Sequence, residues 1–122
     1  VLDVILGPRT DWFTKQAVGQ LTDQLWQVTA SSNRIGLRLS SEKPLDREQL
    51  QELPSEGTCI GAIQVPANGQ PVLFLNDHPL TGGYPVIGAV CEYHLDLAGQ
   101  IPVNAKIRFN PFGEFKVLQG SD

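Results

Sequence analysis

The sequence predicts a mainly β protein in which short strands form a barrel or a sandwich. Short apolar runs recur along the chain and are separated by turn residues, and the 122 residues include 12 Gly and 9 Pro. Only one segment has the apolar spacing of a substantial helix that packs on a core. Evenly spaced short strands with glycine and proline between them are typical of barrels and sandwiches.

The N-terminal part is predicted to form one strand and then one helix. Residues 1–6, VLDVIL, are apolar and end at Gly7-Pro8, a pair that stops strands. Thr14 is placed as the N-cap of a helix over residues 15–23, whose apolar positions share one helical face.

The following segments are predicted to be two strands and a long polar connection. Residues 25–29 are rich in β-forming types. Residues 34–40 alternate with a period of two, which places Ile35, Leu37 and Leu39 inward and Arg34, Gly36 and Arg38 outward. Residues 40–57 are polar, so we expect a surface excursion in which residues 45–53 form one or two helical turns.

The C-terminal half is predicted to consist of strands joined by tight turns. Strands at 59–65 and 72–76 flank a turn at 66–71, where Asn68-Gly69 supplies the positive φ values of a hairpin. Residues 72–76 are apolar on both faces, which indicates a central strand. The remaining expected elements are strands at 86–94, 104–112 and 115–119, with a helical turn and loop at 96–102.

Composition excludes several classes of protein. The chain has 9 basic and 13 acidic residues and no Lys/Arg cluster, which argues against nucleic-acid binding. No apolar run is long enough to cross a bilayer. Cys59 and Cys91 lie apart in apolar contexts and are expected to be buried, reduced thiols of a cytoplasmic protein. The chain starts without Met and contains none, so we expect a domain or processed piece of a longer protein.

The search for chemical motifs points to the segment NDHPLTGGYP at residues 76–85. Hydrolase, Walker-type and metalloprotease motifs are absent from the sequence, and the two histidines, His78 and His94, stand alone, so no metal site is predicted. His94 is expected to end a strand at the surface. The candidate site instead uses polar residues at strand ends, where small-molecule sites are often built. These residues are Asn33, Arg34, Gln64, Asp77, His78, Thr81, Gly82, Gly83 and Tyr84.

The residue types suit a small polar ligand. Adjacent glycines at 82 and 83 let backbone amides approach an anion or a carbonyl, and Arg34 can grip a carboxylate or phosphate. Asp77 at a strand end can act as a general base. The alternative is purely structural: a glycine turn, an Asx cap at Asp77 and a surface ion pair at Arg34.

Three blocks together resemble one family. They are GPRTDWFT at 7–14, SNRIGLRL at 32–39 and GAIQVPANGQPVLFLNDHPLTGGYPVIGAV at 61–90. In order and spacing they resemble allophanate hydrolase subunit 2, the biotin-dependent carboxyltransferase family that includes the C subunit of 5-oxoprolinase and KipA. Two positions depart from the family pattern: Asn76 replaces a small residue, and HPL at 78–80 replaces the commoner Arg-Gln-Thr.

The resemblance implies a closed, cyclophilin-like β-barrel with one or two short helices, formed by residues 1–122 as the C-terminal half of a longer subunit. It implies an amide- or lactam-processing enzyme that works with the N-terminal half and a KipI-like partner, the B subunit, in ATP-dependent hydrolysis of 5-oxoproline or a urea-derived substrate. Arg34 and Asp77 would be catalytic. The other seven candidate residues would bind substrate. The isolated domain would be inactive.

The resemblance leaves alternative functions open. In urea carboxylase relatives the domain takes part in carboxyl transfer from carboxybiotin to urea, so biotin is implied for those relatives, and the cofactor of this chain stays unassigned. In the Kip system it is a regulatory module that counteracts a kinase inhibitor. A dense polar cluster at a barrel mouth favours an enzyme, whereas a broad exposed apolar patch favours the regulator. A prolyl isomerase is disfavoured, because a fold is often shared without its site.

Overall fold

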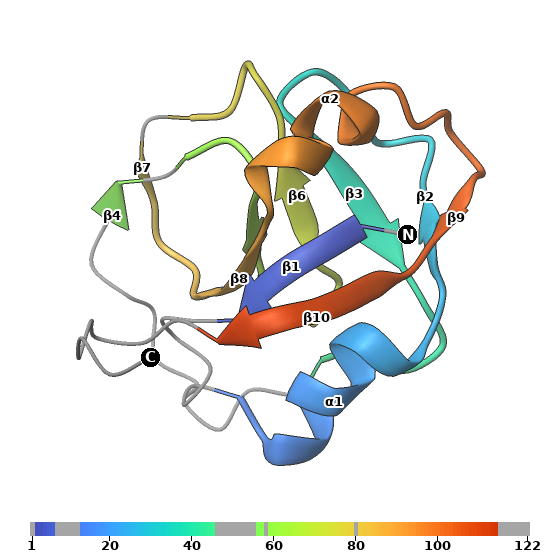
Figure 1. The fold of residues 1–122 in the computed structure, drawn as a ribbon, viewed down its shortest axis with the longest axis vertical. Helices are drawn as coiled ribbons and strands as arrows, with labels where there is room; N and C mark the ends of the chain where they lie inside the picture. The colour runs from blue at the N-terminus through green and yellow to red at the C-terminus, as the bar shows by residue number, and fades with distance from the viewer. Residues whose placement is uncertain (1, 7–12, 46–55, 58, 80, 115–122) are drawn as a thin grey trace.

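The computed structural model describes residues 2–6, 13–45, 56–57, 59–79 and 81–114, and it is mainly β. An eight-stranded sheet has the order β10-β1-β8-β5-β6-β3-β2-β9, and β4 and β7 form a separate two-stranded ribbon (Figure 1). The strands are β1 (Leu2–Leu6), β2 (Trp26–Val28), β3 (Gly36–Ser40), β4 (Glu56–Gly57), β5 (Ala62–Gln64), β6 (Val72–Phe74), β7 (Thr81–Gly82), β8 (Val86–Val90), β9 (Lys106–Ile107) and β10 (Phe109–Glu114).

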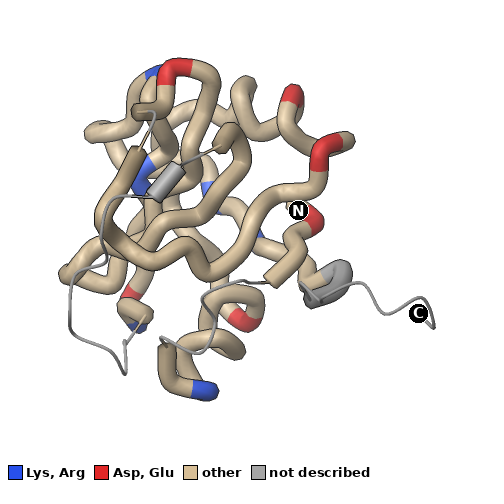
Figure 2. Tube along the Cα trace, turned by 90° about the vertical axis from the view of Figure 1, so that its left-hand side faces the viewer, with Lys and Arg blue, Asp and Glu red and all other residues tan. Residues whose placement is uncertain are grey.

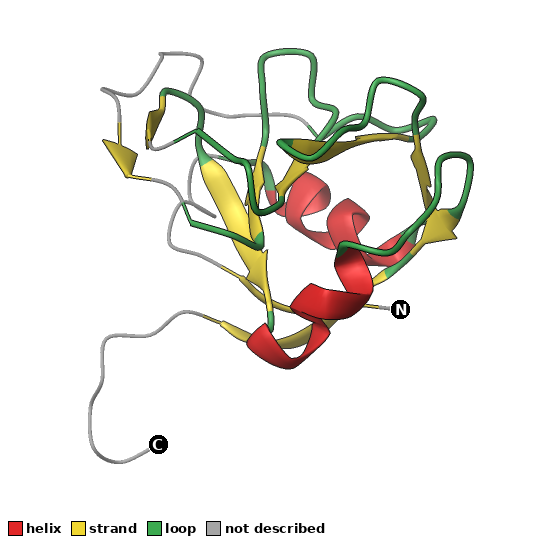
Figure 3. Ribbon diagram, turned by 90° about the horizontal axis from the view of Figure 1, so that it is seen from above, coloured by secondary structure: helices red, strands yellow, loops and turns green. Residues whose placement is uncertain are grey.

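One segment of chain joins the two ends of the sheet. β9 pairs with β2 and β10 pairs with β1, and only Arg108 separates β9 from β10. The sheet therefore curls until both of its ends meet in residues 106–114. Seen from above, strands lie to the left and to the right of the helices (Figure 3). The predicted closed barrel is confirmed.

The helices lie at opposite ends of this barrel in Figure 1. α1 (Lys15–Asp23) has the predicted bounds, and the predicted N-cap is confirmed, because Thr14 Oγ1 accepts a hydrogen bond from Ala17 N at 3.0 Å. At the other end a 3-10 turn, η2 (Glu92–His94), leads into α2 (Leu95–Ala98). None of the helices in the described part of the chain has both the length and the apolar character required to cross a membrane.

The main core fills the interior of the barrel. Inward residues of β1, β2, β3, β5, β6 and β8 pack with the buried face of α1, and Trp26 and Phe109 are the largest of the fully buried side chains. A second, smaller apolar cluster lies on the outer face of the central strands and consists of Ala62, Val72 and Phe74, with Val86 packed against it. β6 is buried at all three positions, as expected for a central strand.

Several sequence-based predictions need correction near strand ends. Ile35 is exposed at 42%, because the pairing of β3 with β6 starts only at Gly36 and Ile35 belongs to the preceding turn. Gly36 faces outward as predicted, since it pairs with Phe74 of the outer cluster, but it is buried against Val72 and Leu73. The predicted strand at 86–94 ends at Val90, and the chain turns into η2.

Two loop predictions are also corrected. The excursion predicted for 40–57 is not entirely superficial: Leu45 is 2% exposed, and its N–H donates to Gly69 O at 2.8 Å. Gly69 has a positive φ of 76°, but Asn68 does not. Cys91 is buried whereas Cys59 is exposed, and neither forms a disulfide. The helical turns expected at 45–53 and the strand at 115–119 fall, apart from Leu45, outside the described residues.

Candidate functional site

The candidate site is centred on the place where β3 begins and β6 ends. Leu75 N donates to Ile35 O at 3.0 Å, and Asp77 N donates to Arg34 O at 3.1 Å. These bonds continue the β3–β6 ladder past its last paired residues. Arg34 and Asp77, distant in sequence, are thus held next to each other through their backbones, and both residues are exposed.

Asn33 shapes the turn that presents Arg34. Its Oδ1 atom accepts hydrogen bonds from Ile35 N at 2.9 Å and from Gly36 N at 3.4 Å. This Asx turn is a local alternative to ladder bonding, which explains why the strand starts only at Gly36. The side-chain Oδ1 of Asn33 therefore already accepts two hydrogen bonds, and its Nδ2 group can donate to a ligand.

His78 lies over the outer apolar cluster. Its ring centroid is 5.9 Å from that of Phe74. Its Nδ1 atom is 2.7 Å from Pro79 O, and because a carbonyl only accepts, Nδ1 carries the hydrogen and donates it. The segment that follows β6 thus folds back across the outer wall of the barrel.

The remaining predicted residues are spread along this outer wall. Gln64 is 8% exposed and lies beside Val72 and Val86 in the neighbouring strands. Thr81 and Gly82 form β7, which pairs with β4, and Gly83 and Tyr84 are half-buried. Pro85 O accepts from Val65 N at 2.9 Å and returns the chain to the sheet.

The structure thus brings some candidates together and leaves others apart. Asn33, Arg34, Asp77 and His78 share one strand end, while Gln64 and residues 81–84 extend the region along the outer wall. In the described part of the chain, no hydrogen bond or ion pair joins the side chains of Arg34 and Asp77 to each other. Acidic and basic residues are interspersed along the trace (Figure 2). No three His, Cys, Asp or Glu side chains of the described residues lie close enough to hold a metal ion.

A second polar cluster was missed by sequence reasoning. Asp3 on β1 accepts from Tyr93 Oη and, at 2.8 Å, from Asn110 Nδ2. Asp3 N donates at 2.9 Å to His94 Nδ1, so His94 lies in η2 and ties it to β1 rather than ending a strand. No spacing signal could have revealed this cluster, because Asp3 is about 90 residues or more from each of its partners in sequence.

The cluster shifts two pKa values in opposite directions. The Tyr93 hydroxyl, and then the Asn110 amide, stabilise the Asp3 carboxylate and lower the pKa of Asp3 below its ordinary 3.8. The same bond to Asp3 raises the pKa of Tyr93 above its ordinary 10.0. Because the pKa of Asp3 is lowered, its carboxylate stabilises the fold above the ordinary pKa of an Asp, and this stabilisation is lost as the pH falls below that value. Because the pKa of Tyr93 is raised, its protonated hydroxyl stabilises the fold below the ordinary pKa of a Tyr, and this stabilisation is lost as the pH rises above that value.

Replacing Tyr93 with Phe is therefore expected to lower the free energy of unfolding mainly between about pH 4 and pH 10. Urea unfolding of both proteins at a series of pH values measures the difference, which should shrink outside this window. Tyr93 is 61% exposed, so the variant loses little packing. A difference independent of pH would show that the hydroxyl–carboxylate bond does not contribute to stability.

Comparison with known proteins assigns the family. Residues 1–111 match the family model described as carboxyltransferase domain, subdomain A and B. The chain belongs to this carboxyltransferase-domain family. It is 38% identical over 103 residues to the C subunit of 5-oxoprolinase from Escherichia coli, a match that covers 84% of this chain and 33% of that protein. The corresponding C subunit from Haemophilus influenzae is 33% identical, over 69% of this chain and 27% of the relative.

A solved structure of a family relative supports the fold. The crystal structure of the K. lactis urea amidolyase superimposes with a TM-score of 0.83 at 26% identity, over 90% of this chain and 7% of that one. This member of the carboxyltransferase-domain family thus shares its barrel with a domain of a much longer protein. It spans about a third or less of the length of each of these relatives.

Proposed function

We propose that residues 1–122 are the C-terminal half of a longer protein that corresponds to the C subunit of 5-oxoprolinase. The observation that carries the proposal is the 38% identity to the E. coli protein over 84% of this chain. The proposed reaction is ATP-dependent hydrolysis of a cyclic amide or urea-derived substrate, performed with the N-terminal half and a KipI-like partner, the B subunit. We assign no residue of this chain to ATP.

The catalytic roles are proposed for Arg34 and Asp77. A substrate placed over the β3–β6 strand end would have its carbonyl polarised by the Arg34 guanidinium, which favours the charge that develops on oxygen when the amide is attacked. Asp77 would take or position the N–H proton of the amide. The backbone bond between the two residues supports this pairing, because it fixes the spacing of their Cα atoms.

Substrate contacts are proposed for the surrounding residues. Asn33 presents Nδ2, since its Oδ1 is used in the turn. Gln64 would contact the substrate from its place between Val72 and Val86 on the outer wall. The remaining contacts come from His78, Thr81, Gly82, Gly83 and Tyr84.

The two free cysteines support a cytoplasmic location, where thiols stay reduced.

A second candidate is the carboxyltransferase domain of a biotin-dependent urea carboxylase. The description of the matching family and the structural similarity to a urea amidolyase favour it. The polar strand end is the same in both cases, because a urea and a lactam need similar hydrogen-bond donors and acceptors.

The function is tested with the longer parent protein mixed with its partner subunit. Glutamate formation from 5-oxoproline and turnover of urea are measured in parallel with ATP. We expect 5-oxoproline turnover that falls by about 10²-fold or more in Arg34→Ala and Asp77→Asn, since each removes a charge that acts on the reacting amide. Arg108→Ala and Asp23→Asn, exposed residues away from this strand end, are the matched controls and should keep full activity.

Each alternative outcome has a distinct meaning. Turnover of urea alone would favour the carboxyltransferase function. No turnover with either substrate, together with tight binding of the partner subunit, would move the protein to the KipA-like regulatory class. Full 5-oxoproline activity in Asp77→Asn would remove Asp77 from the mechanism. Partner binding by each variant, measured by size-exclusion chromatography, separates lost chemistry from lost assembly.

A further inference from the structure

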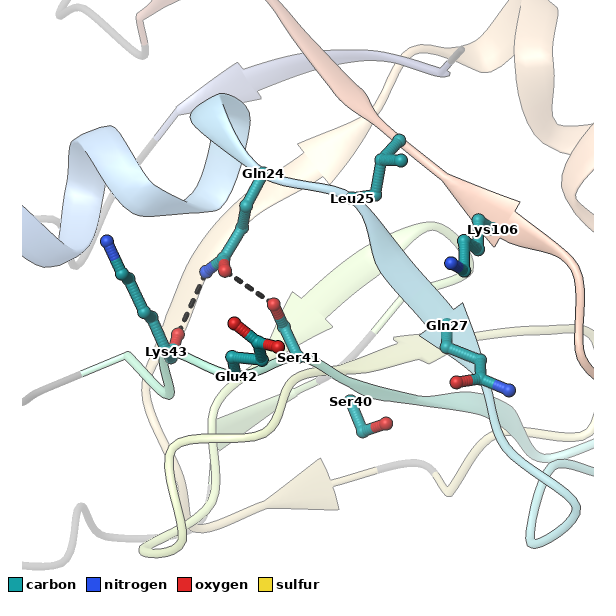
Figure 4. A pocket seen from close by; sticks show the side chains of 8 residues that line it. All are labelled: Gln24, Leu25, Gln27, Ser40, Ser41, Glu42, Lys43 and Lys106. Atoms are coloured by element: carbon teal, nitrogen blue, oxygen red, sulfur yellow. Dashed lines mark hydrogen bonds between the residues drawn. The ribbon is translucent and has the colours of Figure 1, made fainter.

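A polar pocket lies on the outer face of the sheet, away from the candidate site. Its volume is about 590 Å³, and Figure 4 shows its lining: Gln24, Leu25, Gln27, Ser40, Ser41, Glu42, Lys43 and Lys106. Small-molecule sites have volumes of roughly 300–1,000 Å³. None of the residues assigned to the β3–β6 strand end lines this pocket, so a ligand bound here is independent of the proposed function.

Three neighbouring strands present a row of hydrogen-bonding groups to the pocket. Gln27 of β2 is paired with Ser40 of β3 on one side and with Lys106 of β9 on the other. Paired residues of antiparallel strands point to the same face, with Cβ atoms about 5 Å apart. Trp26 and Val28 point into the core, so this row of a hydroxyl, an amide and an ammonium faces outward.

The wall beside this row is held in place by side-chain amides. Gln24 Nε2 donates to Lys43 O at 2.8 Å, and Gln24 Oε1 accepts from Ser41 Oγ (dashed lines in Figure 4). From the other side, Gln70 accepts from Ser41 N at 3.2 Å and donates to Ser41 O at 3.3 Å. Residues 41–43 are thus fixed before any ligand arrives, which reduces the entropic cost of binding.

The charge of the pocket differs from that of the chain. Two ammonium groups, Lys43 and Lys106, and one carboxylate, Glu42, give the lining a net charge of +1, whereas the chain carries −4. Among the described residues, neither lysine forms an ion pair. Gln27 Nε2 donates a long hydrogen bond, of 3.4 Å, to Asn104 Oδ1, and Gln27 Oε1 can accept a hydrogen bond from a ligand. Leu25, 48% exposed, adds an apolar surface.

We propose that this pocket binds a small organic carboxylate that also carries an amide group. The carboxylate accepts hydrogen bonds from Lys106 and Ser40, because an ammonium and a hydroxyl are donors suited to an anion. The amide N–H of the ligand donates to Gln27 Oε1, because the Gln24 amide is already used to hold residues 41–43. The carbon chain of the ligand covers Leu25.

The probe is succinamate, which carries one carboxylate and one amide, titrated into the ¹⁵N-labelled chain. We expect saturable shifts of the amide signals of residues 24–27, 40–43 and 106. The neutral diamide succinamide should bind about tenfold more weakly or worse, since it lacks the charge-assisted bond. Affinity should also fall as salt is raised from about 0.01 M to 0.1 M, because salt screens the lysine.

Lys106→Gln is expected to weaken succinamate binding about tenfold, and Lys106→Arg should restore most of it. Lys15→Gln, which removes an exposed lysine at the start of α1 outside this pocket, is the matched control and should bind as the unchanged chain does. Equal binding of succinamate and succinamide, shifts that do not saturate, or an equal loss in Lys15→Gln would each overturn the proposal.

Discussion

Replacing Trp26 with Ala is expected to lower the free energy of unfolding by about 3–5 kcal/mol. Trp26 is 0% exposed and is the largest of the fully buried side chains, so its removal leaves a large cavity between α1 and the sheet. Its Nε1–H also donates at 2.9 Å to Leu21 O. That carbonyl lies in the last turn of α1, where helix carbonyls have no partner within the helix. Urea unfolding followed by circular dichroism measures the loss.

Two further variants separate the contributions of Trp26. Trp26→Phe keeps most of the ring volume but removes the donor, so a loss of about 1–3 kcal/mol is expected from the unpaired Leu21 carbonyl. Leu25→Ala changes the adjacent residue, which is 48% exposed, and should cost less than about 1 kcal/mol. A Trp26→Ala protein as stable as Leu25→Ala would contradict the placement of Trp26 in the core.

The parts of the fold that sequence reasoning predicted are those with local causes. The helix at 15–23 was predicted to the residue, because a capping threonine and apolar residues on one face are short-range signals. The central strand at 72–74 was recognisable because it is apolar on both faces. The prediction that the Ile35 side chain points inward was wrong, because the strand pattern was extended into a turn that the Asn33 side chain forms.

The features that could not be predicted depend on contacts between distant segments. Residues 106–114 join the two ends of the sheet because β9 pairs with β2 and β10 pairs with β1. The alternation of side chains along a strand shows which face is buried but does not show which strands pair. The same limit applies to the sites. The 76–85 segment stood out by composition, whereas the Asp3–Tyr93 contact and the row formed by Ser40, Gln27 and Lys106 exist only once the strands are aligned.

The second large effect is expected at the turn between β5 and β6. Gly69→Ala should lower the free energy of unfolding by at least about 2 kcal/mol. Gly69 has a φ of 76°, a region that costs other residues energy, and an added Cβ would lie 2.8 Å from both Leu45 O and Pro44 Cβ. Leu45 lies this close to Gly69 because Leu45 N donates a hydrogen bond to Gly69 O at 2.8 Å. Urea unfolding again provides the measurement.

Gly19→Ala is the matched control, because it makes the same chemical change with the opposite expected sign. Gly19 lies inside α1, and its added Cβ would meet only Asp23 Oδ2, at an ordinary 3.6 Å. Alanine in a helix interior is favoured over glycine by about 1 kcal/mol, so this variant should be more stable. If both variants were stabilised, the 66–70 turn would not require a positive φ at Gly69.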